Sequence, residues 1–122
     1  MNNQNIIYEN DLVYIEIEPS QIPWLKIFTK DNSSELSQCN IETKSEIFRL
    51  LDIIEKAMLS FYNPTKINIA SFGNYLPKVH FHIMARFKED DYFPEPMWGK
   101  QQRKGELKIK EIKNFLQVLK LD

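Results

Sequence analysis

The stretch from Lys78 to Phe87 constrains the fold more than any other part of the chain, because apolar and polar side chains alternate along it. Alternation with a period of two is typical of a β-strand that has one buried face and one open face. The apolar positions of the stretch are Val79, Phe81, Ile83, Ala85 and Phe87. The chain has only two histidines, His80 and His82, and both fall on the open face, roughly 6.5–7 Å apart along the backbone. Lys78 and Arg86 share that face, so the sequence predicts a row of nitrogen groups on one side of a sheet.

Length and composition indicate one domain that spans residues 1–122 and has a genuine hydrophobic core. The net charge is −1, which does not favour binding to nucleic acid or to a membrane surface. One cysteine, Cys39, excludes an internal disulfide framework. The N-terminal segment 1–5 is polar and lacks the basic start and apolar run of a signal peptide, so we expect a cytoplasmic protein.

The rest of the chain alternates between strand and helix patterns. A long amphipathic helix is expected from about residue 42 to residue 62, where apolar residues recur at helical spacing and Asn63-Pro64 ends the pattern. A second helix is expected in a C-terminal extension, about residues 106–121. Further strands are expected at 12–18, 24–30 and 67–72, with a short apolar segment at 6–8 that pairs at a sheet edge or packs as an arm. The strands at 12–18 and 24–30 resemble a hairpin, so we expect a sheet that is at least partly antiparallel.

The two histidines admit several interpretations. They are ordinary hydrogen-bonded residues, or ligands of a metal, or groups that act on an anion. Two imidazoles alone do not make a zinc site, and the neighbouring cations Lys78 and Arg86 repel a dication, so we expect no metal and no cofactor. The same cations favour an anionic substrate such as a phosphate. A histidine beside them stays neutral more readily and is available as a nucleophile for phosphoryl or nucleotidyl transfer.

Several blocks in order resemble the histidine-triad (HIT) superfamily over about residues 12–99. These blocks are residues 67–74 (INIASFGN), residues 80–87 (HFHIMARF), Asp90, and residues 93–99 (FPEPMWG). Residues 23–25 (PWL) are similar to one bacterial branch of that superfamily. The resemblance implies an α+β fold with an antiparallel sheet of about five strands and one long helix, and a homodimer. It also implies a nucleotide hydrolase or nucleotidyl transferase acting at an α-phosphate, with dinucleoside polyphosphates or nucleoside phosphoramidates as substrate types.

The resemblance also assigns roles to individual residues. The superfamily motif alternates three histidines with apolar residues, and its middle histidine, the nucleophile, matches His80. His82 matches the third histidine, while Lys78 stands where the first would be, a position that often holds an amide in the bacterial branch. Asn68 and Asn74 match residues that contact the phosphate. The histidine that many members carry in the N-terminal half is absent here, so a nucleotide-binding or regulatory protein without turnover is the alternative.

Three further interpretations concern the surroundings of the histidines. Arg86 either reaches phosphate or pairs with Asp90 to brace the following loop, and we favour the pair because arginine–carboxylate pairs are common. Trp98 is expected to pack in the core or at a dimer interface rather than to stack on a base. The nucleoside pocket is expected to be lined by side chains such as Trp24 and Ile27.

Overall fold

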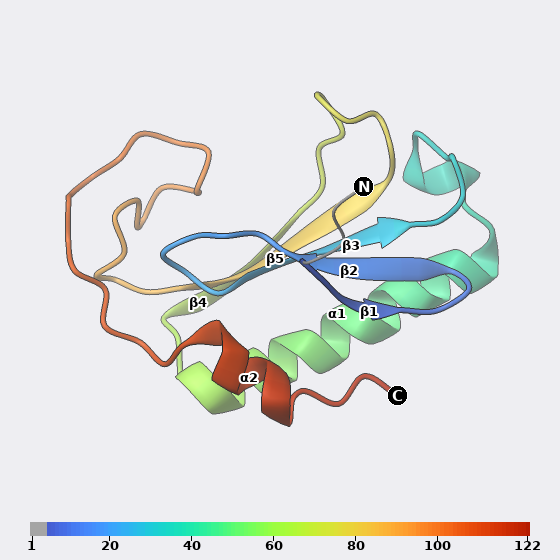
Figure 1. The fold of residues 1–122 in the computed structure, drawn as a ribbon. Coiled ribbons are helices and arrows are strands. Elements are labelled where there is room, and N and C mark those ends of the chain that lie inside the picture. The colour runs from blue at the N-terminus through green and yellow to red at the C-terminus, as the bar shows by residue number, and fades with distance from the viewer. Residues whose placement is uncertain (1–4) are drawn as a thin grey trace.

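The fold was examined in a computed structural model, which describes residues 5–122. The segment 1–5, on which the expectation of a missing signal peptide rests, lies almost entirely outside the described residues. Five strands form one sheet in the order β1-β2-β3-β5-β4, and every neighbouring pair is antiparallel (Figure 1). The strands are β1 (Ile6–Glu9), β2 (Val13–Ile17), β3 (Trp24–Thr29), β4 (Lys66–Ala70) and β5 (His80–Arg86). The predicted α+β class with a five-stranded antiparallel sheet is thus confirmed, and the segment at 6–8 is an edge strand.

Helix α1 (Ile41–Tyr62) begins and ends where the sequence pattern indicates. The side chain of Asn40 accepts a hydrogen bond from the Thr43 backbone N–H at 2.8 Å, which caps the first turn. Asn63 ends the helix in the left-handed conformation, with φ of 47°, just before a proline. Helix α1 and the C-terminal helix α2 (Ile112–Val118) lie on the same side of the sheet (Figure 1). The apolar stripe of α1 packs there with Ile15, Ile27 and Ile83 of the sheet in a fully buried core.

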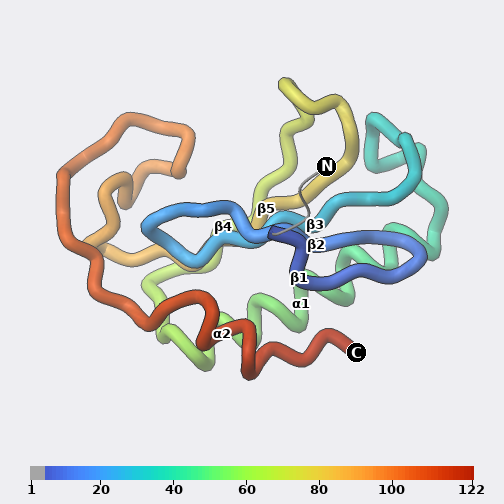
Figure 2. Tube along the Cα trace, in the orientation of Figure 1, coloured from blue at the N-terminus to red at the C-terminus, as the bar shows by residue number. Residues whose placement is uncertain are grey.

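The C-terminal helix exists but is shorter than expected. Helix α2 covers Ile112–Val118, and residues 106–111 and 119–121, which were expected to belong to it, form no regular secondary structure. Leu107 and Ile109 pack on the core, whereas Lys108 and Lys110 are exposed, so the segment follows a period of two, like an irregular strand. The Lys110 ammonium donates to the carbonyl of Phe61 at 3.2 Å, and this bond satisfies one of the open carbonyls at the end of α1. The course of this segment around the end of α1 is visible in Figure 2.

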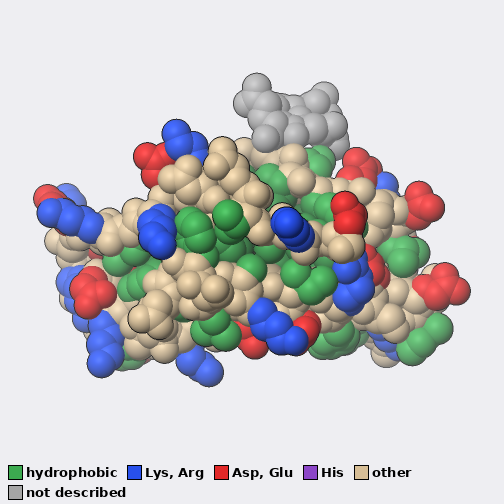
Figure 3. Space-filling model, turned by 90° about the horizontal axis from the view of Figure 1, so that it is seen from below, with side chains coloured by type: hydrophobic (Ala, Val, Ile, Leu, Met, Phe, Trp, Pro, Cys, Tyr) green, Lys and Arg blue, Asp and Glu red, His purple; other side chains and the backbone are tan. Residues whose placement is uncertain are grey.

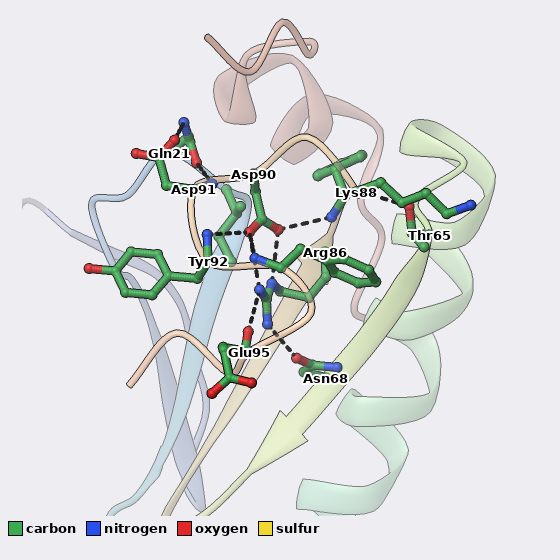
Figure 4. Close-up of polar contacts among 12 residues, drawn as sticks. Gln21, Thr65, Asn68, Arg86, Lys88, Asp90, Asp91, Tyr92 and Glu95 are labelled. Atoms are coloured by element: carbon green, nitrogen blue, oxygen red, sulfur yellow. Dashed lines mark hydrogen bonds and ion pairs between the residues drawn. The ribbon is translucent and has the colours of Figure 1, made fainter. Parts of the chain in front are cut away.

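The loop after β5 is held by a buried ion pair (Figure 4). Arg86 donates through Nε and Nη2 to the two carboxylate oxygens of Asp90, at 3.0 and 3.1 Å, and both side chains are buried. Asp90 also accepts from the backbone N–H groups of residues 87, 92 and 93. The favoured interpretation of Arg86, an ion pair with Asp90 that holds the following loop, is therefore confirmed. This ion pair positions residues 88–99 beside β4 and β5.

The face seen from below carries Lys and Arg side chains interspersed with Asp and Glu and with hydrophobic groups (Figure 3). A surface of mixed sign gives no extended basic field on that face. Among residues 5–122, neither α1 nor α2 combines the length and the apolar composition that a membrane crossing requires.

Candidate functional site

A pocket of about 410 Å³ lies on the sheet face opposite α1. We call this the site face and define it by Trp24, Lys26, Phe28, His80 and His82. The pairing of β3 with β5 sets Lys26 opposite His82 and Phe28 opposite His80. Four of these side chains line the pocket, and its remaining wall comes from residues 72–76 and from Trp98. The two imidazoles point to one face, as the alternation predicts, and their ring centroids are 5.1 Å apart.

The loop between β4 and β5 closes over this pocket because two features set its path. Gly73 has a φ of +76°, a left-handed conformation that side-chain-bearing residues rarely adopt. The hydroxyl of Ser71 donates to the backbone carbonyl of His80 at 2.7 Å and ties the loop to β5. As a result Asn74, one of the predicted phosphate ligands, lies in the pocket wall.

His80 is held by groups that determine which of its nitrogens carries the proton. Its Nδ1 lies 2.7 Å from the backbone carbonyl oxygen of Lys78. A carbonyl oxygen only accepts, so Nδ1 carries the hydrogen, and Nε2 keeps a lone pair to which no residue among 5–122 donates. The imidazole also stacks on Phe28, with centroids 5.0 Å apart, and Phe28 stacks on Tyr14 at the same separation. Backbone and stack together fix the ring with its lone pair on Nε2, the arrangement that a nucleophile requires.

His82 occupies a different environment only two residues away. The indole Nε1–H of Trp24 donates to its Nδ1 at 3.0 Å. Burial, then the proximity of His80 and Lys26, lowers the pKa of His82 to about 4, while Glu18 acts weakly in the opposite direction. His82 is therefore neutral at pH 7.

Two of the predicted site residues lie outside the described wall of this pocket. The Lys78 ammonium donates to the Tyr14 hydroxyl at 3.3 Å and lies over that ring, on the far side of Phe28. The side-chain oxygen of Asn68 accepts from Arg86 at 2.9 Å (Figure 4). The structure thus brings His80, His82 and Asn74 together and leaves Lys78 and Asn68 apart from them. Their roles as phosphate ligands stay predictions.

The pocket wall also contains two residues that the sequence did not assign to the site. Lys26 supplies a cation to the wall and pairs with Glu18 at 2.8 Å. Trp98 was expected to pack in the core or at a dimer interface; it is half exposed and so not in the core, and its ring centroid lies 4.8 Å from that of His82, while the interface stays a prediction. The alternation along β3 predicts that Lys26 shares a face with Trp24 and Phe28. It places Lys26 beside the histidines only if β3 is known to pair with β5. The expectation that Ile27 lines the pocket is wrong, because Ile27 points to the opposite face and is fully buried in the core.

The architecture and the site define a class: small α+β proteins that carry a pair of alternating histidines on an interior strand of an antiparallel sheet. The chain belongs to the HIT family, since the HIT domain matches its sequence over residues 1–89. No curated protein matches the sequence.

Solved structures share this fold at low sequence identity. A histidine triad protein from Bradyrhizobium japonicum is 22% identical, with a TM-score of 0.77 over 96% of this chain and 90% of that one. A histidine triad protein from Sinorhizobium meliloti is 21% identical, with a TM-score of 0.74 over 94% and 87% of the two chains. A protein from Sulfolobus tokodaii described as a hypothetical histidine triad nucleotide-binding protein is 15% identical, with a TM-score of 0.59 over 94% and 77%.

Proposed function

We propose that this protein is a nucleotide hydrolase or nucleotidyl transferase that acts at an α-phosphate through a covalent intermediate on His80. The observation that carries the proposal is the contact between His80 Nδ1 and the Lys78 carbonyl, because it leaves the Nε2 lone pair free at the wall of a pocket. Membership of the HIT family supports a nucleotide as the ligand. The substrate types proposed are dinucleoside polyphosphates and nucleoside phosphoramidates.

The reaction proceeds in two displacements at phosphorus. In the first, the Nε2 lone pair of His80 forms a bond to the α-phosphorus, and the bond from phosphorus to the leaving phosphate, nucleotide or amine breaks; an amine leaves with a proton taken up from the medium. In the second, water attacks the same phosphorus, the N–P bond breaks, and its electron pair returns to Nε2. Water supplies a proton to the medium and its oxygen to the nucleotide product. We propose that His82 and Asn74, which line the same pocket as His80, donate to the phosphoryl oxygens, where negative charge builds up in each step.

We further propose that Lys78 stands at the position of the first histidine of the family motif. We propose that Lys78 contributes through its backbone, because its carbonyl oxygen contacts Nδ1 of His80 while its ammonium lies against Tyr14. A backbone carbonyl is present whatever the side chain is, so the substitution leaves the orientation of the nucleophile intact.

Replacing His80 with alanine is expected to lower turnover at least about 10³-fold, because the nucleophile and its covalent intermediate are lost together. The measurement is release of AMP from a diadenosine polyphosphate and from an adenosine phosphoramidate, with mass spectrometry of the acid-sensitive adenylylated protein. AMP binding by calorimetry serves as the control that the pocket of the variant is intact. Wild-type protein that binds AMP but turns over neither compound would contradict the enzyme and favour the binding protein.

We also propose that the protein is a homodimer joined through the β4 edge. β4 ends the sheet, and apolar side chains beside it are left open: Ile69 is 44% exposed, and Phe48 of α1 is 54% exposed where it contacts Phe81. A free strand edge with apolar neighbours is the surface on which a second copy extends a sheet.

The double variant F48E/I69K is therefore expected to convert a dimer into a monomer. The measurement is light scattering after size-exclusion chromatography. Val118→Lys on α2 is the matched control, since Val118 is equally exposed at 56% but lies outside this edge. A monomeric wild type, or a double variant that stays dimeric, would refute this interface.

A further inference from the structure

The two histidines each bind a partner that plays only one hydrogen-bonding role. An indole N–H donates and never accepts, so Nδ1 of His82 must be the acceptor in its 3.0 Å contact with Trp24. The proton of neutral His82 is consequently on Nε2. For His80 the partner is a carbonyl, which forces the opposite arrangement. Two imidazoles 5.1 Å apart therefore carry their protons on different nitrogens.

The position of Trp24 is itself fixed by the fold. It is the first residue of β3 and pairs in register with Met84 of β5, beside the pair formed by Lys26 and His82. Its indole packs against the ring of Trp98 at 5.3 Å. Strand register and this aromatic contact thus keep the N–H directed at His82.

The charges around His82 act in the same direction as this contact. Burial, then the neighbouring His80 on β5 and Lys26 opposite on β3, all disfavour the protonated form of His82. Glu18, from the segment after β2, favours that charge but is paired with Lys26 at 2.8 Å. Protonation of Nδ1 would also turn the acceptor of the Trp24 bond into a donor and break the bond.

We propose that Trp24 is a positioning residue, which holds His82 neutral and presents its Nε2–H as a fixed hydrogen-bond donor to the phosphoryl group in the pocket. The bond itself is independent of any activity, whereas its catalytic consequence rests on the proposed function. His80 then presents a lone pair and His82 presents a proton, so one anionic group meets its nucleophile and its donor on neighbouring residues.

The chain is well suited to a direct test, because it contains two histidines and two tryptophans in all. In protein labelled with ¹⁵N at histidine and tryptophan, His82→Gln identifies the His82 signals by their loss. The expected wild-type result at pH 7 is an unprotonated Nδ1 on His82 that shows scalar coupling to the indole nitrogen of Trp24. A wild-type His82 with its proton on Nδ1, or with no such coupling, overturns the proposal without any need for a variant.

Trp24→Phe removes the donor and keeps an aromatic ring, and Trp98→Phe is its matched control. Trp98 contacts the His82 ring at 4.8 Å, but no hydrogen bond joins the two among the described residues. In W24F the coupling should vanish and the pKa of His82 should rise, because Nδ1 becomes free to take a proton. Both properties should be unchanged in W98F.

The catalytic consequence is read from the pH profile of kcat/KM. W24F should lower kcat/KM about 10-fold relative to the wild type, which is the size expected for one misdirected hydrogen bond, and its acid limb should move to higher pH. A W24F profile equal to that of the wild type overturns the positioning role. If the wild type binds AMP without turnover, the proposed function fails separately. AMP affinity then decides, because weaker binding in W24F than in the wild type supports the role of Trp24 and equal binding overturns it.

Discussion

Replacing Asp90 with alanine is expected to lower the free energy of unfolding by about 3–5 kcal/mol, which is the range for breaking a buried ion pair from one side. Arg86 is 1% exposed, and its guanidinium donates twice to this carboxylate. The variant leaves a buried charge with the Glu95 carbonyl and the Asn68 side chain as its remaining acceptors. It also strips the acceptor from three backbone N–H groups. Urea denaturation followed by circular dichroism measures the loss.

A surface pair of the same spacing provides the matched control. Asp52 and Lys56 are four residues apart on α1 and lie 2.9 Å from each other, but Asp52 is 59% exposed. Asp52→Ala should therefore change the free energy of unfolding by less than about 1 kcal/mol. Equal effects in the two variants would show that burial of the Arg86 pair contributes nothing. Because the braced loop carries Trp98 into the pocket wall, Asp90→Ala should also weaken AMP binding.

Acidification from pH 7.5 to pH 4.5 is expected to cost about 2–3 kcal/mol of folding free energy through His82 alone. Burial, followed by the proximity of His80 and Lys26, lowers the pKa of His82 to about 4, whereas the unfolded chain has the ordinary value of 6.5. Between these values the unfolded chain binds a proton that the folded chain does not, so acid favours unfolding. Stability is fully present above about pH 6.5 and declines as the pH falls toward 4.

The contribution of His82 can be separated from those of the carboxylates. Burial opposes the charged form of Asp90, but the bonds from Arg86 and from the backbone outweigh it and hold the pKa of Asp90 below its usual value. Asp90 therefore loses its stabilising charge only at pH values below the His82 range. Urea denaturation at several pH values should show a slope between pH 6.5 and 4.5 that His82→Gln reduces. An identical slope in the two proteins would contradict the lowered pKa.

Local patterns were enough to predict the elements on which the site stands. The alternation around His80 and His82 predicted their shared face, because side-chain direction along a strand depends only on position parity. The spacing of apolar residues likewise predicted helix α1, and Asn63-Pro64 predicted its end. The pattern failed at residues 106–111, where Leu107 and Ile109 were taken as the start of a helix although they alternate with exposed lysines. The apolar positions of such a short segment fit both the helical period and the strand period of two. Packing against α1 decides which conformation the segment adopts.

The sequence alone determined the family resemblance, the strand that carries the two imidazoles and the pairing of Arg86 with a nearby carboxylate, because each depends on residues close together in the chain. The tertiary structure alone decided which groups face those imidazoles. Trp24 lies 58 residues before His82 and reaches it only because β3 pairs with β5. The same pairing places Lys26 in the pocket, while the ammonium of Lys78 turns to Tyr14. Hydrogen-bond partners contributed by distant strands depend on sheet order and register, and these are properties of the whole fold.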